Sequence, residues 1–214
     1  MIRHLASVLL GLALALPASA EQVRYFKVEG VAANDTLSVR EGPSASAAKI
    51  GELAPDTPVV EITATNADGT WGRTIWYEGD GWVSMRYLAR AEIDTFFDTG
   101  PGHPTGVPVG LSCGGNEPFW GLSFDAPDRL VYSTPETPET ALSVGAIHVA
   151  SGRRGLPVSY RLATPDFDAL AIVSAAACSD TMSDRTYGYQ INLWTEDETG
   201  ATFRTGCCSL PADN

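Results

Sequence analysis

The amino-acid sequence predicts an all-β protein. Apolar and polar residues alternate with the two-residue period of a half-buried strand, most clearly at Tyr187, Tyr189, Ile191 and Leu193. Clusters of Gly, Pro, Asn and Asp separate such runs, as turns separate short strands. Spacing typical of a helix is not sustained anywhere after residue 20. We therefore expect two domains built from short strands and turns.

The first 20 residues are typical of a secretory signal peptide. Arg3 and His4 precede an apolar run from Leu5 to Leu16, which is too short to span a bilayer as a stable helix. A small-x-small triplet ending at Ala20 follows, so we expect cleavage after Ala20. No later segment is apolar enough to cross a membrane. The expected location is the periplasm or the outside of the cell.

Residues 21–91 are predicted to form the first domain from short strands. Leu37 and Val39 alternate with polar neighbours, and a Gly-Pro-Ser turn follows them. Further strands are expected at residues 59–62, 71–77 and 82–83.

Four short motifs of this domain form one pattern. They are Leu37-Ser38-Val39-Arg40-Glu41-Gly42-Pro43-Ser44, Ile50-Gly51-Glu52-Leu53, Gly81-Trp82-Val83 and Tyr87-Leu88. The pattern resembles a bacterial SH3 domain, with Ser38 at a position where that family most often has Asn. The resemblance implies an SH3-like small barrel. It also implies a module that binds cell-wall peptides, binds proteins or acts as a spacer.

If this domain binds a peptide, exposed aromatic rings should form the contact surface, because flat rings bury a large area at a low cost in side-chain entropy. The candidates are Trp71, Trp76, Trp82 and Tyr87, with Arg40 available for a carboxylate. The alternative interpretation is structural. In that case Trp82 packs inside the small barrel and Arg40 pairs with an acidic side chain.

Residues 92–110 are rich in Gly, Pro and Thr. They show no apolar periodicity and contain several residues that break regular structure. We expect a flexible linker between the two domains.

Residues 111–214 are predicted to form a second all-β domain. Trp120, Leu122 and Phe124 alternate with small or polar residues, and Val158 and Tyr160 continue the pattern further on. Strands are expected near residues 120–125, 129–133, 141–149, 157–163, 169–176, 186–195 and 201–207. Consecutive strands joined by turn clusters predict an antiparallel β-barrel or a curled sheet.

All four cysteines, Cys113, Cys178, Cys207 and Cys208, lie in the second domain. An even number in an exported protein indicates two disulfides that pin the fold. A bridge between Cys207 and Cys208 is disfavoured, because adjacent Cα atoms lie about 3.8 Å apart, below the usual disulfide range. Cys113 and Cys178 should each bond one member of the pair, with both pairings open. Because neighbouring strand residues point to opposite faces, one bridge should lie inside and the other outside.

Three further motifs lie in the second domain. They are Gly115-Asn116-Glu117-Pro118-Phe119-Trp120, Cys178-Ser179-Asp180-Thr181-Met182-Ser183-Asp184-Arg185-Thr186-Tyr187 and Gly206-Cys207-Cys208, here called the envelope motifs. Together they resemble an uncharacterised envelope domain of proteobacteria that occurs in exported proteins and lipoproteins. That family has no established activity, so the resemblance implies compartment and fold only.

The envelope motifs contain the remaining candidate ligand-binding residues, Asn116, Glu117, Trp120, Asp180 and Asp184. Glu117 with Asp180 or Asp184 would suit acid/base chemistry on a glycan. The alternative is that Glu117 and Asn116 bond backbone groups and Asp180 closes an Asx turn. The sequence predicts no catalytic residue, no cofactor and no metal site. For calcium, so short an acidic turn lacks the number of oxygen ligands that the ion needs.

The chain is acidic, with 14 basic and 26 acidic residues and a formal net charge of −12. Removal of the signal peptide takes away Arg3 and no acid, which leaves 13 basic residues and a charge of −13. Such a surface repels phosphate backbones and anionic headgroups. We therefore expect neither nucleic acid as a partner nor membrane insertion of the mature chain.

The leading hypothesis is a non-catalytic envelope protein. Its SH3-like domain would bind a peptidoglycan peptide or an envelope protein, and its second domain would have an unassigned binding role. One alternative is a cell-wall enzyme that uses Glu117 with Asp180 or Asp184. Another is an inhibitor or adaptor whose acidic surface contacts a basic envelope enzyme such as lysozyme. The sequence leaves open the ligand, the oligomeric state and the relative orientation of the domains.

Overall fold

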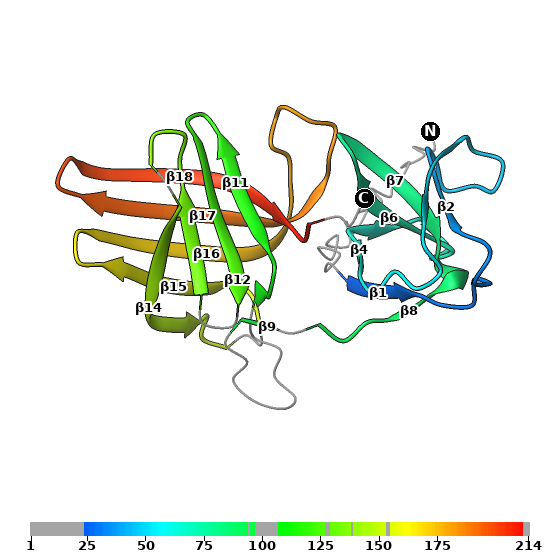
Figure 1. Cartoon of the computed structure of the whole chain (residues 1–214), viewed down its shortest axis with the longest axis horizontal. Coiled ribbons are helices and arrows are strands. Elements are labelled where there is room, and N and C mark those ends of the chain that lie inside the picture. Colours follow the sequence, from blue (N-terminus) through cyan, green and yellow to red (C-terminus); the bar gives the residue numbers. More distant parts are fainter. Residues whose placement is uncertain are drawn as a thin grey trace, which may run out of the picture.

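The computed structural model describes residues 24–93, 95–96, 107–126, 129–137, 139–152 and 155–211. The predicted signal peptide and most of the predicted linker lie outside these residues. Within them the chain is all-β, as predicted, and forms two domains side by side (Figure 1). The N-terminal domain contains small sheets, and the C-terminal domain is a closed barrel.

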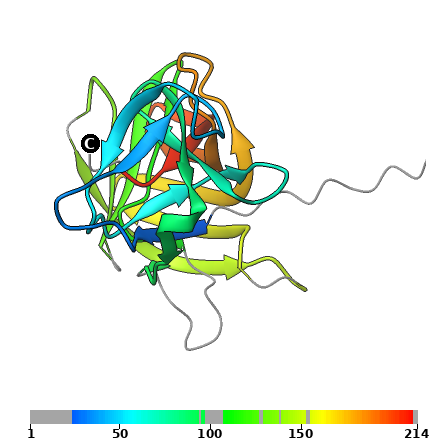
Figure 2. The same cartoon turned by 90° about the vertical axis from the view of Figure 1, so that its right-hand side faces the viewer.

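The N-terminal domain consists of two small antiparallel sheets and one 3-10 turn. One sheet has the order β4-β1-β8 and the other has the order β3-β2-β7-β6-β5. Their bounds are β1 Arg24–Val28, β2 Leu37–Arg40, β3 Lys49–Leu53, β4 Val60–Ile62, β5 Ala64–Thr65, β6 Trp71–Trp76, β7 Gly79–Ser84 and β8 Leu88–Arg90, with the 3-10 turn at Met85–Tyr87. Figure 2 views this domain end on, with the barrel behind it.

The two small sheets share one hydrophobic core. Leu37 and Val39 on β2 are buried, as their alternation predicts, and Val39 has no exposed surface. Trp76 at the end of β6 also belongs to this core. It packs against Gly51, where an added Cβ would lie only 2.0 Å from the Trp76 ring. The glycine of the second sequence motif therefore makes room for a core tryptophan.

The C-terminal domain is an eight-stranded antiparallel barrel. Each strand from β11 to β18 pairs with the next, and β18 pairs with β11 to close the barrel. The bounds are β11 Ser112–Asn116, β12 Phe119–Ala126, β13 Arg129–Ser133, β14 Thr140–Val149, β15 Val158–Thr164, β16 Phe167–Cys178, β17 Tyr187–Asp197 and β18 Gly200–Ser209. The sequence left a barrel and a curled sheet open, and the β11–β18 pairing shows a barrel.

The seam between β11 and β18 depends on glycine. An added Cβ at Gly206 would lie 2.2 Å from the carbonyl oxygen of Gly114, and one at Gly115 would lie 2.4 Å from Nε1 of Trp120. The Trp120 ring fills the space that these glycines leave and is buried in the barrel core. Trp120 is thus chiefly a packing residue of the seam.

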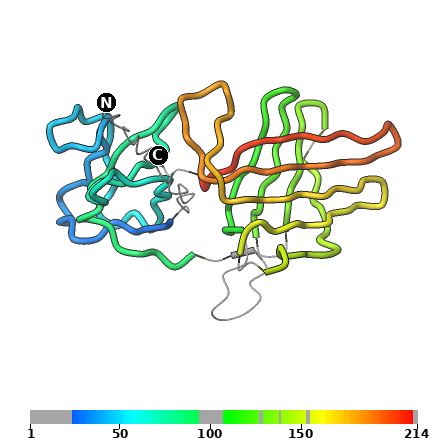
Figure 3. The backbone as a smooth tube through the Cα atoms, turned by 180° about the vertical axis from the view of Figure 1, so that it is seen from behind, coloured from blue at the N-terminus to red at the C-terminus, as the bar shows by residue number. Residues whose placement is uncertain are grey.

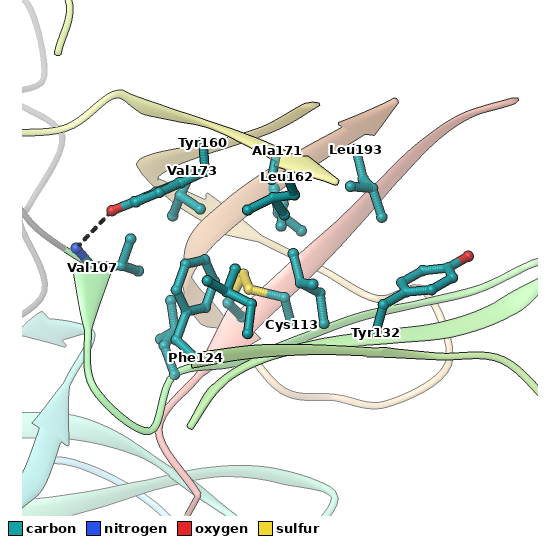
Figure 4. Packing of buried hydrophobic residues seen from close by; sticks show 14 of the residues in the cluster. Val107, Cys113, Phe124, Tyr132, Tyr160, Leu162, Ala171, Val173 and Leu193 are labelled. Atoms are coloured by element: carbon teal, nitrogen blue, oxygen red, sulfur yellow. Dashed lines mark hydrogen bonds between the residues drawn. A yellow bond between two sulfur atoms is a disulfide. The ribbon is translucent and has the colours of Figure 1, made fainter. Parts of the chain in front are cut away.

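The barrel interior is filled with apolar side chains. Phe124 and Tyr160 meet edge to face with ring centroids 5.4 Å apart. Figure 4 shows Val107 and Tyr132 at opposite ends of the row of core side chains. Val107 belongs to β10 (Val107–Pro108), which pairs with β9 (Thr95–Phe96), and its amide donates to the Tyr160 hydroxyl at 3.3 Å. The barrel core therefore begins within the range predicted as a linker.

Two disulfides connect the last strand to earlier parts of the barrel. Cys113 bonds Cys208, and Cys178 bonds Cys207. The first bridge belongs to the hydrophobic core, whereas Cys207 and the half-buried Cys178 lie outside it. The predicted absence of a vicinal bridge and the predicted placement of one bridge inside and one outside are both confirmed. The structure also decides between the two pairings that the sequence left open.

Candidate functional site

A groove of about 610 Å³ crosses the N-terminal domain between the β1–β2 loop and the 3-10 turn. We call it the N-terminal groove. It brings together Arg40, Trp71 and Tyr87, three of the five residues predicted for ligand binding in this domain. Asp35 and Arg86 also line it, so both signs of charge lie beside two aromatic rings.

The two arginines of the N-terminal groove have different roles. Arg40 donates from Nη1 to the Ala47 carbonyl at 2.7 Å, and this bond holds the β2–β3 loop. Its partner is thus a carbonyl, not the acidic side chain that the structural alternative expected. Arg86 is exposed, with its guanidinium carbon 5.6 Å from the centroid of the Tyr87 ring. Arg86 is therefore the arginine better placed to meet a carboxylate from solvent.

The other two predicted tryptophans do not line the N-terminal groove. Trp76 is 9% exposed and lies in the core, not on the exposed surface where a ligand-binding ring was expected. Trp82 is half-buried on β7, on the face opposite the buried Val83. Arg40 and Arg73 lie opposite it on the two neighbouring strands. Trp82 is consequently neither in this groove nor in the core, where the structural alternative placed it.

A second groove, of about 600 Å³, lies between the two domains. We call it the interdomain groove. Its lining includes Asn116, Trp120, Asp180 and Cys207, so all three envelope motifs contribute to it. Tyr77 supplies a wall from the N-terminal domain. Segments that are far apart in the sequence thus meet at one place.

Asp180 organises the loop between β16 and β17. Its Oδ1 accepts the amides of Met182 and Ser183 at 3.0 and 2.9 Å, and its Oδ2 accepts the Tyr187 hydroxyl at 2.9 Å. Asn116 donates from Nδ2 to the Asp180 carbonyl at 2.6 Å. Burial tends to raise the pKa of the Asp180 carboxyl, but these amide and hydroxyl donors lower it below its usual value. The geometry therefore agrees with the structural alternative, in which Asp180 closes an Asx turn and Asn116 bonds a backbone group.

The β16–β17 loop, residues 179–186, contacts the N-terminal domain (Figure 3). Arg185 donates from Nε to the Tyr77 carbonyl and from Nη2 to the Glu78 carboxylate, the latter at 3.1 Å. The Thr186 amide donates to Asp80 Oδ1 at 2.9 Å. The Asp184 amide also donates to the Glu78 carbonyl at 2.9 Å. We call this set of bonds the domain clasp.

A second contact between the domains is buried. Glu61 on β4 accepts the Leu210 amide at Oε2 over 2.8 Å, while its buried Oε1 has no hydrogen-bond partner. The hydroxyls of Tyr25 and Tyr189 lie 2.5 Å apart across the same boundary. Burial raises the pKa of Glu61 to about 7, although the Leu210 amide opposes the change. Glu61 is not among the residues that the sequence predicted, and its one signal is an acid inside the apolar run Val59–Ile62.

The acidic residues considered for catalysis are not arranged as an exposed acid/base pair. Glu117 is exposed in the β11–β12 turn and does not line the interdomain groove. Asp184 is exposed and takes part in the domain clasp through its backbone. Asp180 has both carboxylate oxygens engaged, and its lowered pKa is unsuited to a general acid. The geometry therefore gives the enzyme hypothesis no support.

The described residues contain neither a helix suited to crossing a membrane nor a cluster of metal-ligating side chains. In this part of the chain, no helix is long and apolar enough to span a membrane. Nor do three or more His, Cys, Asp or Glu side chains of the described ranges form a group able to hold a metal ion. In comparisons with known proteins, the chain matches no family model, no curated protein and no solved structure.

Proposed function

We propose that this chain is a non-catalytic, exported envelope protein whose N-terminal domain is SH3-like and binds a peptide of peptidoglycan. The observation that carries the proposal is the meeting of Arg40, Trp71 and Tyr87 in the N-terminal groove. Arg86 adds an exposed cation at the same place.

The chemistry of the N-terminal groove suits a short peptide with a free carboxylate. The rings of Trp71 and Tyr87 provide area for small side chains, and Arg86 provides hydrogen-bond donors in a fork that matches a carboxylate. Asp35 is available for an ammonium group of the peptide. Stem peptides of the cell wall combine these three features in a few residues.

The proposal includes the compartment. Two disulfides fit an oxidising environment, in which such bonds form and persist. We propose export to the periplasm or beyond, with cleavage of the signal peptide after Ala20.

The second domain contributes in two ways under this proposal. The domain clasp holds the N-terminal domain against the barrel, and the interdomain groove provides a further concave surface beside it. Phe119, which is 54% exposed, lines that groove and offers an apolar contact. A ligand longer than a stem peptide would reach this second surface.

Co-sedimentation of the exported chain with purified sacculi tests the proposal. We expect the wild-type protein to pellet, and we expect Trp71→Ala and Arg86→Met each to weaken binding about tenfold, the effect typical of a strong contact residue. Phe203→Ala and Arg161→Met are the matched controls, because both residues are exposed on the barrel. Arg86 is exposed, so its variant tests the groove even if Trp71→Ala folds poorly.

Three outcomes would contradict the proposal. Failure of the wild-type protein to pellet would remove the wall as the ligand and make an envelope protein the next candidate. Release of soluble fragments from the sacculi would indicate an enzyme. Inhibition of lysozyme at low salt but not at high salt, without wall binding, would instead support the inhibitor hypothesis.

A further inference from the structure

The barrel has a cavity of about 380 Å³ at its end farthest from the N-terminal domain. The β15–β16 and β17–β18 turns lie at this end (Figure 1). Its lining includes Tyr132, Phe167, Thr195 and Arg204. We call it the distal cavity. None of its lining residues also lines the N-terminal groove.

Arg204 points into the barrel at the base of this cavity. It lies on β18 on the same face as the core residue Cys208, because four positions separate them and strand side chains alternate. Its register partner on β17 is Leu193, which is fully buried. The barrel therefore carries a guanidinium group immediately beyond its apolar core.

The guanidinium of Arg204 is poorly satisfied. Nη1 donates to Thr195 Oγ1 at 2.9 Å, but Nε is buried and has no hydrogen-bond partner. None of the ion pairs found among the described residues involves Arg204. Arg204 is half-buried, and after the hydrogen bonds from Thr199 its charge also lowers the pKa of the Asp197 carboxyl. Its buried Nε still lacks an acceptor, which a bound carboxylate would supply together with a direct ion pair.

The rest of the distal cavity has two other features. Tyr132 and Phe167 stack with ring centroids 5.3 Å apart and an interplanar angle of 26°. Glu136, Asp166 and Asp197, all exposed, contribute carboxylates from three different turns around the opening. The cavity thus combines an inner cation, an aromatic pair and an acidic rim.

We propose that the distal cavity binds a small amino carboxylate, that is, an amino acid or a very short peptide. The ligand carboxylate would lie on Arg204, the ammonium group would face the acidic rim, and an apolar side chain would pack on Tyr132 and Phe167. The volume is at the lower end of the range for small-molecule pockets, which suits a ligand of this size. A simple anion fits less well, because the rim carboxylates would repel it.

Calorimetric titration of the exported chain with L-phenylalanine tests the site, since this probe carries all three groups. L-alanine tests the need for a ring, 3-phenylpropionate lacks the ammonium group, and L-phenylalanine amide lacks the carboxylate. We expect phenylalanine to bind and each truncated probe to bind about tenfold more weakly or worse. We expect Arg204→Met to weaken phenylalanine binding by a similar factor or abolish it.

Two variants control for general effects. Arg161→Met removes an arginine from the outside of the barrel, where it pairs with Asp168, and should leave binding unchanged. Arg204→Lys keeps the charge but loses the guanidinium fork, so binding should fall to an intermediate level. Arg204→Met should fold at least as well as the wild type, because it replaces a half-buried charge that forms no ion pair among the described residues by an apolar chain. Melting curves verify this point.

Absence of phenylalanine and alanine binding at concentrations up to about 10 mM would overturn the proposal. So would binding that Arg204→Met leaves intact. Equal affinity for phenylalanine and 3-phenylpropionate would contradict the part assigned to the acidic rim. Because Arg204 lies outside the N-terminal groove, these results are independent of the sacculus experiment.

Discussion

Glu61 lies in an environment that disfavours its charged form. It stands in a three-residue strand between two buried apolar neighbours, Val60 and Ile62, and its carboxyl group lies at the domain boundary. The groups closest to it in this boundary are the Leu210 amide on one side and the hydroxyls of Tyr25 and Tyr189, whose pKa values it helps to raise. Folding therefore favours the neutral, protonated acid.

The raised pKa of Glu61 predicts a specific pH dependence of stability. The value is about 7 in the folded protein against 4.5 ordinarily, so the folded state keeps a proton that the unfolded state loses. Below pH 4.5 the Glu61 carboxyl is protonated in both states and does not change the free energy of unfolding. Between pH 4.5 and about 7 the free energy of unfolding falls as the pH rises. Above about pH 7 this loss of stability is complete. Urea unfolding from about pH 5 to about pH 8 should show a loss of about 1 to 3 kcal/mol from this group.

Glu61→Gln isolates this effect. Glutamine keeps an oxygen for the Leu210 amide but does not ionise, so the variant should lack this part of the pH dependence. Glu41→Gln, at an exposed position, serves as the control and should follow the wild type. If the Glu61→Gln and wild-type curves run parallel across this pH range, the carboxyl group is not held neutral by the fold.

At the level of strands, the alternation of residue types was sufficient to predict most strands of the barrel. Strands β12 to β18 lie within three residues of their predicted ranges, because apolar runs with buried residues at alternate positions are bounded by turn residues. β11 was missed, since Ser112-Cys113-Gly114-Gly115-Asn116 shows no apolar alternation. Its glycines are required by the close approach of Trp120 and β18, a constraint that only the assembled seam reveals.

Disulfide connectivity, too, could be predicted only in part from the sequence. Chain geometry excludes a bridge between adjacent cysteines, but the choice between the remaining pairings depends on which face of β18 each residue occupies. The register that places Cys113 opposite Cys208 decides it.

The two bridges should differ in their contribution to stability. They close loops with sequence separations of 95 and 29 residues, for Cys113–Cys208 and Cys178–Cys207 respectively. The chain-entropy model gives about 4.7 and about 3.6 kcal/mol. We expect the Cys113→Ala/Cys208→Ala protein to be less stable in urea than the Cys178→Ala/Cys207→Ala protein. The buried position of the first bridge adds to the difference. The opposite order of stability would show that Cys178–Cys207 stabilises the fold by more than the closure of its loop.

For the molecule as a whole, the arrangement of the domains could not be predicted from the sequence. The residues of the domain clasp come from a turn in one domain and a loop in the other, and neither has a periodic pattern. The envelope motifs looked like a candidate site, yet Arg185 and Thr186 chiefly connect the domains. By contrast, three residues predicted from the first-domain motifs and their flanking strands do line the N-terminal groove. Trp76 does not line it, because its ring packs on Gly51 in the core.

Arg185→Met should loosen the domain clasp without unfolding either domain. Exposed ion pairs contribute little to stability, so the melting temperature should change only slightly. The amides of Asp184 and Thr186, which bond across the boundary, should exchange their hydrogens about tenfold faster. Hydrogen exchange measured by mass spectrometry verifies this, with Arg161→Met as the control. Unchanged exchange at these amides would mean that the buried contact at Glu61 alone fixes the domains.

The adjacent cysteines of β18 have a consequence for how this protein matures. Under the export that we propose, Cys113 and Cys178 would reach the oxidising compartment before either native partner, because both precede Cys207 and Cys208 in the chain. A premature bond between these two would have to be undone by thiol–disulfide exchange once β18 follows. Oxidation and closure of the barrel are therefore the same late event, and a catalyst of disulfide rearrangement should speed the recovery of native protein from the reduced chain.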